Sequence, residues 1–216
     1  MTGPDHDSPA PSLDARRPLK SRSTRWAARL SAAAVRAGLT ADSISIASLL
    51  CAAAGSAALL WWRWPWGLLA CAAGIQLRLL CNLLDGMVAV EGGRRSKVGA
   101  LYNEVPDRIA DSMFLVALGY AVGLDWLGWL AALAAALTAY IRVLGGTLGL
   151  AQDFRGPQAK PHRMAVMTLA CLLGVVEWAW RSEAQVLRLA LWVIAIGALL
   201  TCGTRLLAIA RQLRAR

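Results

Sequence analysis

Six apolar segments alternate with short polar stretches along the chain, after a polar beginning. Each is about 17–25 residues long, which is enough for a helix to cross a hydrocarbon core ~30 Å thick. The segments lie at 42–62, 66–90, 100–123, 126–149, 164–180 and 184–207. None shows the alternating pattern of an outer-membrane β-strand. The pattern predicts an all-α polytopic membrane protein, whose single domain of six transmembrane helices spans residues 41–210.

The chain before the first apolar segment divides into two parts. Residues 1–21 are rich in Pro, Ser and Asp and contain no apolar run, which predicts a disordered cytoplasmic tail. Residues 22–40 place Trp26 and Leu30 near one helical face and several arginines on the other. This pattern predicts an amphipathic helix at the membrane interface, where anionic headgroups attract the arginines. A plain charged tail is the alternative.

Composition agrees with a membrane protein. Hydrophobic residues make up 57% of the 216-residue chain and charged residues 17%, which is more apolar surface than a soluble domain of this length can bury. The net charge is +10, but most Lys and Arg lie between apolar segments, so we expect no nucleic-acid partner. The five cysteines all lie within apolar segments and form no CxxC pair, so we interpret them as small buried hydrophobic residues.

The basic residues between the segments are unevenly distributed. The loops after the second and fourth segments carry six Lys or Arg, whereas the three loops on the other side carry only Arg63 and Arg181. Both ends of the chain are basic as well, including residues 211–216. Because positively charged loops stay in the cytoplasm, both termini are predicted to be cytoplasmic. Eight of the ten Trp cluster at the opposite turns, as expected of an aromatic belt.

Ionisable and amide side chains concentrate at the cytoplasmic ends of the second and third segments. Asn82 and Asp85 share one helical face, and Asn103, Asp107 and Asp111 share another. The loop between the segments is short, so the two faces can meet in an antiparallel hairpin. Carboxylate and amide oxygens suit Mg²⁺, Mn²⁺ or Ca²⁺ better than zinc. We therefore expect a divalent-cation site that binds phosphates, with one carboxylate acting as a general base. A polar helix–helix contact is the alternative.

The same stretch resembles the signature of the CDP-alcohol phosphatidyltransferases, D-x2-D-G-x2-A-R-x8-G-x3-D-x3-D. The residues that fall on signature positions are Asn82, Asp85, Gly86, Ala89, Gly99, Asn103 and Asp107. The chain departs from the signature at Asn82 and Asn103, where the family has Asp, and at Val90, where it has Arg. Two amides in place of two carboxylates weaken cation binding. Glu104 and Asp111 are acids close enough in sequence to compensate.

The resemblance implies a membrane enzyme of the cell inner membrane, both termini cytoplasmic. It would transfer a phosphatidyl group from CDP-diacylglycerol or a similar CDP-alcohol to a small polar alcohol, releasing CMP.

The resemblance also implies roles for individual residues. Two divalent cations, Mg²⁺ or Mn²⁺, are implied, with ligands Asn82, Asp85, Asn103 and Asp107. The proton acceptor would be Asp107 or Asp111, with Asp107 favoured. The residues implied to border the nucleotide are Asp85, Gly86, Ala89 and Gly99. Those implied to bind phosphates of the lipid donor or of the acceptor are Arg78, Arg142, Lys160 and Arg163. A homodimer is also implied.

Other interpretations stay open from the sequence. The two Asn substitutions also suit a catalytically altered paralogue. A small membrane transporter would place charged groups near the middle of the bilayer, but here they lie at one face. Arg142 could pair with a buried Asp, and Lys160 and Arg163 could simply mark the cytoplasmic side. The sequence does not identify the acceptor alcohol.

Overall fold

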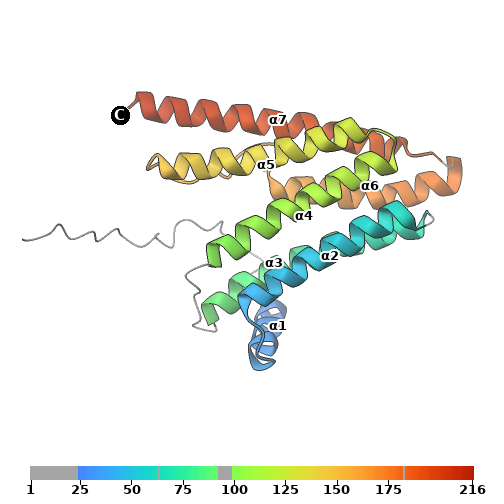
Figure 1. The fold of residues 1–216 in the computed structure, drawn as a ribbon, viewed down its shortest axis with the longest axis horizontal. Helices are drawn as coiled ribbons and strands as arrows, with labels where there is room; N and C mark the ends of the chain where they lie inside the picture. The colour runs from blue at the N-terminus through green and yellow to red at the C-terminus, as the bar shows by residue number, and fades with distance from the viewer. Residues whose placement is uncertain (1–23, 63, 92–98, 182) are drawn as a thin grey trace, which may run out of the picture.

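The computed structural model describes residues 24–62, 64–91, 99–181 and 183–216, and within these ranges every regular element is helical (Figure 1). The predicted tail at 1–21 lies outside the described residues. The helices are α1 (Arg25–Arg36), α2 (Ala41–Trp61), α3 (Trp66–Glu91), α4 (Gly99–Ala121), α5 (Asp125–Thr147), α6 (Lys160–Arg181) and α7 (Gln185–Arg214). The predicted all-α class is confirmed.

The six predicted segments correspond to α2 through α7. Among the described residues, five helices are long and apolar enough to cross a membrane: α2, α3, α5, α6 and α7. The 23-residue α4 carries Glu104, Asp107, Arg108 and Asp111, which make it more polar than the others. Five of the six predicted spans thus correspond to such helices, whereas the count of six is not confirmed: the third predicted segment, 100–123, forms a helix of similar length that is more polar.

Two helix boundaries differ from the predicted segments. Helix α6 begins at Lys160, four residues before the predicted start, so Lys160 and Arg163 lie on a helix and not in a loop. Pro161 is compatible with this start. The N–H groups of the first helical turn have no acceptor within the helix, so a proline there removes no helical hydrogen bond. Helix α7 continues to Arg214, past the predicted domain end at residue 210.

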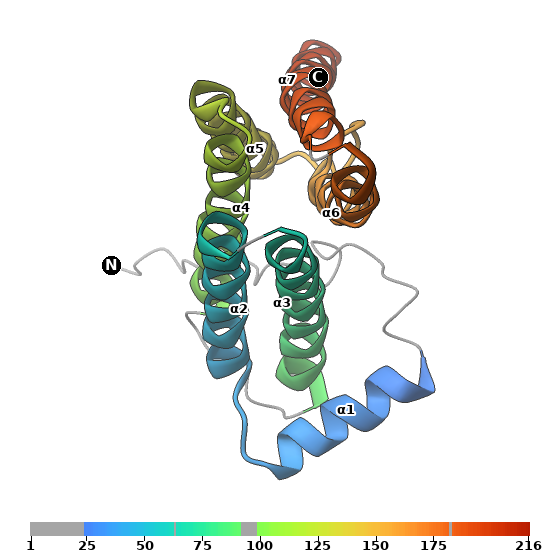
Figure 2. The same cartoon turned by 90° about the vertical axis from the view of Figure 1, so that its right-hand side faces the viewer.

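The predicted amphipathic helix forms as α1 and crosses the end of α3 (Figure 2). Its small side chains face the protein: Ala27 packs against Leu83 and Met87 of α3. Trp26 and Leu30 remain exposed. The contacting face thus consists of small residues, and the large apolar side chains are left for the membrane interface, as expected for this helix.

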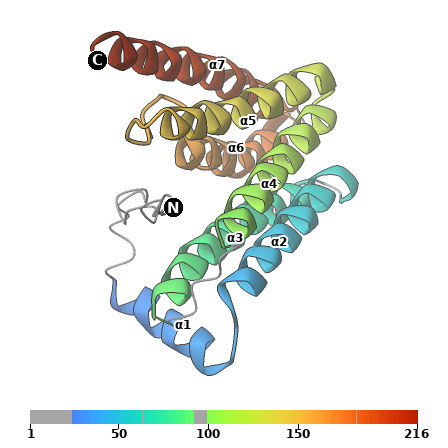
Figure 3. The same ribbon diagram turned by 60° about the vertical axis from the view of Figure 1, so that its left-hand side comes forward.

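Helices α3 and α4 both pack on α2, and α4 runs between α2 and α5 (Figure 3). Glycines permit the closest of these crossings. A Cβ on Gly74 of α3 would lie 2.9 Å from the Cα of Gly55 on α2. A Cβ on Gly119 of α4 would lie 2.7 Å from the Cα of Gly128 on α5. Small residues at membrane helix contacts allow backbones to approach this closely, so α3 packs tightly on α2 and α4 packs tightly on α5.

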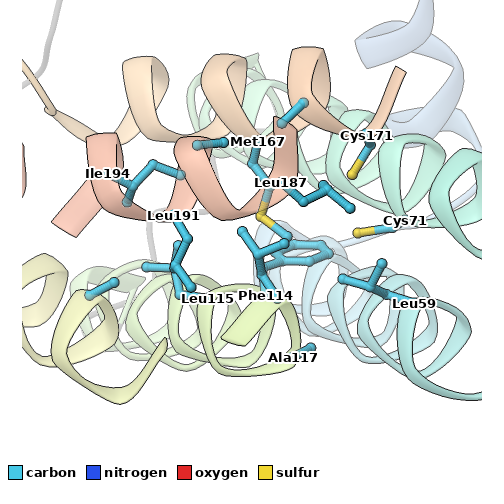
Figure 4. Close-up of a cluster of buried hydrophobic side chains, with 14 of the residues drawn as sticks. Leu59, Cys71, Phe114, Leu115, Ala117, Met167, Cys171, Leu187, Leu191 and Ile194 are labelled. Atoms are coloured by element: carbon cyan, nitrogen blue, oxygen red, sulfur yellow. The ribbon is translucent and has the colours of Figure 1, made fainter. Parts of the chain in front are cut away.

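The apolar core lies on the side of α3 and α4 away from the loop that joins them. Phe114 and Leu115 of α4 meet Met167 of α6 and Leu187 of α7 (Figure 4). Cys71 and Cys171 are buried in the same cluster. All five cysteines are free, and Cys71, Cys171 and Cys202 are buried while Cys51 and Cys81 are partly buried. The core thus anchors one half of α3 and α4, and the polar signature lies on the other half.

Candidate active site

The two halves of the signature meet through side chains that reach from α3 to α4. The side-chain NH₂ of Asn82 on α3 donates a hydrogen bond to Oδ1 of Asp107 on α4 at 2.8 Å. Further along α3, Asp85 is buried and accepts a hydrogen bond from Ser45 Oγ of α2 at 2.8 Å. The structure therefore brings together Asn82 and Asp107, two residues that the helical spacing predicts to face each other.

Asp107 is surrounded by positively charged groups. Its Oδ1 also accepts a hydrogen bond from Nη2 of Arg78 at 3.0 Å, and its Oδ2 is ion-paired with Lys160 at the start of α6. Arg108 lies 3.6 Å from the same oxygen. Asp107 is 8% exposed. Contacts with positively charged groups on both carboxylate oxygens hold Asp107 in one position.

Asp111 lies one helical turn from Asp107, between two buried arginines. Its Oδ1 accepts from Arg78 at 2.8 Å and its Oδ2 from Arg163 of α6 at 2.9 Å. Arg163 also donates to the carbonyl oxygen of Gln158 at 2.6 Å. Asp111 is 2% exposed and Arg163 is fully buried. The Asp111 carboxylate thus ties α3 and α6 to α4.

Arg78 is fully buried and has hydrogen-bonding capacity to spare. Within the described part of the chain its hydrogen bonds all come from Nη2, including one to the carbonyl oxygen of Asp107 at 3.2 Å. Its Nε and Nη1 have no hydrogen-bond partner among the described residues. A buried donor without an acceptor costs about 1–3 kcal/mol, so these two nitrogens are suited to an oxygen-rich ligand.

Arg142 lies apart from these carboxylates. It donates to Glu104 of α4 at 2.6 Å and to Gln152 at 2.5 Å, and its guanidinium lies 5.3 Å from the centre of the Phe154 ring. One sequence-based alternative paired Arg142 with a buried Asp. In the structure its acidic partner is instead Glu104, which is partly exposed. Among the four predicted phosphate-binding residues, Arg78, Lys160 and Arg163 converge on Asp107 and Asp111, whereas Arg142 contacts the segment between α5 and α6.

The residues predicted to border the nucleotide lie along one stretch. Gly86 and Ala89 are partly buried on α3, and Gly99 begins α4. Asn103 lies on α4, but its side chain is outside the described part of the structure. These assignments stay predictions.

Two residues of the site, Ser45 and Arg205, were not singled out from the sequence, and a third, Glu104, was given a different role. Ser45, the donor to Asp85, lies on the buried face of α2 with Ser48. Glu104 was noticed only as a compensating acid. Arg205, in an otherwise apolar part of α7, is buried and donates to the carbonyl oxygens of Arg155 and Thr138. An arginine within a predicted membrane span is itself a signal of a polar role.

The segment between α5 and α6 carries its own ion pair. Arg155 contacts Asp153 at 3.0 Å, and its side-chain hydrogen bonds hold the pKa of Asp153 below the ordinary value. With Arg205 bound to the Arg155 carbonyl oxygen, this segment connects α7 to the end of α5 that carries Arg142.

Oxygen donors for a divalent cation are present, in a smaller set than the signature provides. Asp85 and Asp107 supply carboxylate oxygens and Asn82 an amide oxygen, all hard ligands. Asp107 already contacts Arg78 and Lys160, whereas Asp85 forms no ion pair within the described ranges. Those ranges also contain no group of three or more His, Cys, Asp or Glu placed to hold a metal. The donor chemistry fits a hard cation beside Asp85.

No protein-family model matches the chain. The chain is similar to the phosphatidylinositol phosphate synthase of Mycolicibacterium smegmatis, with 28% identity over 82% of this chain and 80% of that protein. The synthase of the same name from Streptomyces avermitilis is 26% identical over 88% and 80%. The archaetidylinositol phosphate synthase of Aeropyrum pernix is 32% identical over 56% and 63%.

Solved structures share the fold. The crystal structure of Mycobacterium tuberculosis phosphatidylinositol phosphate synthase with CDP-DAG bound has a TM-score of 0.70 and 24% identity, covering 86% of this chain and 94% of that chain. The same protein in complex with manganese and citrate has a TM-score of 0.69 and 23% identity, covering 85% and 88%.

Proposed function

We propose that the chain is a CDP-alcohol phosphatidyltransferase, which transfers a phosphatidyl group from a CDP-linked lipid to a small alcohol with release of CMP. The observation that carries this proposal is the hydrogen bond between Asn82 and Asp107. It joins the two halves of the signature next to the buried Asp85 and the basic side chains of Arg78 and Lys160.

The acceptor in this proposal is an inositol phosphate. The relatives from both bacteria and an archaeon are named as synthases of inositol phosphate lipids. A phosphorylated acceptor needs cationic groups besides those that bind the pyrophosphate of the donor. Arg142 and Arg205 contact the same segment between α5 and α6 and lie outside the Asp107 cluster. We assign them to the acceptor phosphate.

Asp107 is the proposed proton acceptor for the attacking hydroxyl. A general base has to be ionised and held within reach of the substrate. Arg78 and Lys160 hold the Asp107 carboxylate in place, and Lys160, which is partly exposed, can move its ammonium group to a phosphate oxygen when substrate binds. Asp111 lies between two buried guanidinium groups, one turn further from the loop that joins α3 and α4, and we assign it the role of positioning Arg78 and Arg163.

The donor pyrophosphate would lie beside α3 and the start of α6. The unpartnered Nε and Nη1 of Arg78 and the ammonium of Lys160 are suited to its oxygens. Asp85 and Asn82 would hold a Mg²⁺ or Mn²⁺ ion. When bound, such a cation polarises the phosphoryl oxygens and neutralises charge on the departing CMP. Gly86 and Ala89 leave the surface of α3 low enough for the cytidine to approach.

We propose that the protein lies in the cell inner membrane with both termini in the cytoplasm, as a homodimer. The placement of basic residues supports this orientation, and it puts the site where a nucleotide from the cytoplasm meets a membrane-held acyl chain. The homodimer follows the family resemblance alone. Fusion of a reporter to the C-terminus tests the orientation, and chemical cross-linking in native membranes tests the dimer.

The deciding experiment is a transfer assay on the purified full-length protein. CDP-diacylglycerol, Mn²⁺ and either inositol phosphate, glycerol phosphate, inositol or serine are supplied, and CMP release and the mass of the lipid product are measured. We expect CMP release with inositol phosphate and a phosphatidylinositol phosphate product. Asp107→Asn and Asp85→Asn should abolish CMP release, and Asp125→Asn, at the exposed start of α5, is the matched control.

A transporter or a paralogue without activity would release no CMP with any acceptor, and this result from a folded protein would overturn the proposal. CMP release with another acceptor, and none with inositol phosphate, would support the transferase activity but contradict inositol phosphate as the acceptor. Equal release by Asp107→Asn and the parent protein would remove the assignment of the base.

A further inference from the structure

We propose that this site holds one divalent cation, at Asp85, and that the charged side chains of Arg78 and Lys160 take the place of a second cation at Asp107. The signature that this chain resembles has four aspartates, which the resemblance implies to hold two cations, and in this chain two of those four positions are Asn. Because the cation belongs to the transferase site, the proposal rests on the function proposed above and specifies its metal content.

The contact between Asn82 and Asp107 shows what the first substitution does. Two carboxylates with oxygens 2.8 Å apart would repel each other unless a cation or a proton lay between them. In this chain the NH₂ of Asn82 faces the carboxylate and donates a hydrogen bond over that distance. The contact is therefore complete without a bridging metal, and the amide nitrogen facing Asp107 offers no lone pair for one.

The charges around Asp107 and Asp111 are also balanced without a metal. Arg78 contacts both carboxylates, Lys160 contacts Asp107, and Arg163 contacts Asp111. A divalent cation bound to Asp107 would lie against two groups of the same sign in a buried place, where their repulsion is poorly screened. Oxygen ligation of a metal by Asp107 would first require these cations to leave.

Asp85 is the remaining carboxylate of the site, and it takes no part in these ion pairs. It is 6% exposed and accepts a hydrogen bond from Ser45, but it forms no ion pair among the described residues. A buried carboxylate without a counter-charge is costly. A single divalent cation at Asp85, with the oxygen of Asn82 and the phosphates of the substrate completing its ligands, supplies that charge.

The experiment counts bound metal. The full-length protein in detergent is dialysed against Mn²⁺ to equilibrium, and the ratio of Mn²⁺ to chain is measured by mass spectrometry of the elements. We expect one Mn²⁺ per chain, a loss of at least tenfold in Mn²⁺ affinity for Asp85→Asn, and one Mn²⁺ per chain for Asp107→Asn. Two Mn²⁺ per chain in the parent protein, or an equal loss in both variants, would overturn the proposal.

A second variant keeps the test decisive if Asp107→Asn does not fold. Asn82→Asp restores a carboxylate next to Asp107. We expect the added negative charge to attract a second Mn²⁺ that displaces the partly exposed ammonium of Lys160, which gives two Mn²⁺ per chain. Gln212→Glu adds the same charge on the exposed end of α7 and should leave the count at one. A count of one in both variants contradicts the role given to Asn82.

The one-cation proposal and the transferase proposal can be contradicted independently of each other. Two Mn²⁺ per chain together with CMP release would contradict the one-cation proposal and support the transferase proposal. One Mn²⁺ at Asp85 without CMP release in the presence of any acceptor would support the one-cation proposal and contradict the transferase proposal.

Discussion

Arg142 of α5 and Glu104 of α4 form an ion pair with 2.6 Å between Nη2 and Oε1. Because Arg142 is proposed to bind the acceptor phosphate, we expect that phosphate to displace the Glu104 carboxylate from the guanidinium. On this proposal Glu104 weakens the binding of the acceptor and favours acceptors whose charge exceeds that of one carboxylate.

Glu104→Gln should lower the KM for the phosphorylated acceptor. The Glu104 side chain is 40% exposed, and exposed ion pairs contribute about 0.2–1 kcal/mol. The corresponding fall in KM is about 1.5- to 5-fold, with the KM for CDP-diacylglycerol unchanged. Steady-state kinetics with each substrate varied in turn measures both values. A fall in both would show that Glu104 acts on the whole site and not on Arg142.

Asp107→Asn and Asp111→Asn should fail in different ways. Loss of a general base lowers the rate by about 10²–10⁴-fold, so Asp107→Asn should lose CMP release and stay folded. Asp111→Asn removes the shared partner of two fully buried arginines, and breaking a buried pair costs about 3–5 kcal/mol. Thermal unfolding in detergent should show a large decrease for Asp111→Asn and a small one for Asp107→Asn. The reverse order would exchange the two roles.

The helices were predictable because their apolar segments are long and the polar residues between them are few. The start of α6 was not, because Lys160, His162 and Arg163 look like a loop on a hydropathy scale. Arg163 is nevertheless fully buried, since Asp111 from another helix neutralises it. A hydropathy scale scores each residue by itself, so it does not include the effect of an ion-pair partner 52 positions away, as Asp111 is from Arg163.

The site was predictable as far as helical periodicity reaches. Spacings of three and four put Asn82 and Asp107 on faces that meet, and the short loop between their helices brings them to one level. The partners that come from α2 and α6 depend on how whole helices pack, so Ser45 at Asp85 and Lys160 at Asp107 carry no local signal. The sequence suggested that Lys160 binds phosphate, and the structure shows which carboxylate it meets first.

Ser45→Ala should weaken cation binding without unfolding the protein. Ser45 Oγ holds Oδ2 of Asp85 at 2.8 Å, and loss of a partner that orients a metal ligand typically costs 10- to 100-fold in metal affinity. We expect the Mn²⁺ dissociation constant to rise by about that factor, with kcat recovered at high Mn²⁺. Ser48→Ala, which removes only a hydrogen bond to the Ser45 carbonyl oxygen, is the matched control. Equal effects of the two variants would point to a change in α2 as a whole.

Gly74→Ala should destabilise the contact between α2 and α3 on which the site is built. The added methyl group would lie 2.9 Å from the Gly55 Cα and 3.0 Å from the carbonyl oxygen of Cys51, both backbone atoms that cannot rotate away. Overpacking of this kind costs about 1–3 kcal/mol. Gly203→Ala on α7 is the matched control, because a Cβ there meets nothing within 4 Å. We expect a lower midpoint of thermal unfolding for Gly74→Ala alone, and because α3 carries Asn82 and Asp85, a weaker Mn²⁺ affinity as well. An unchanged midpoint would mean that α2 and α3 can separate slightly without loss, and that the position of α3 is set by its contacts with α1 and α6.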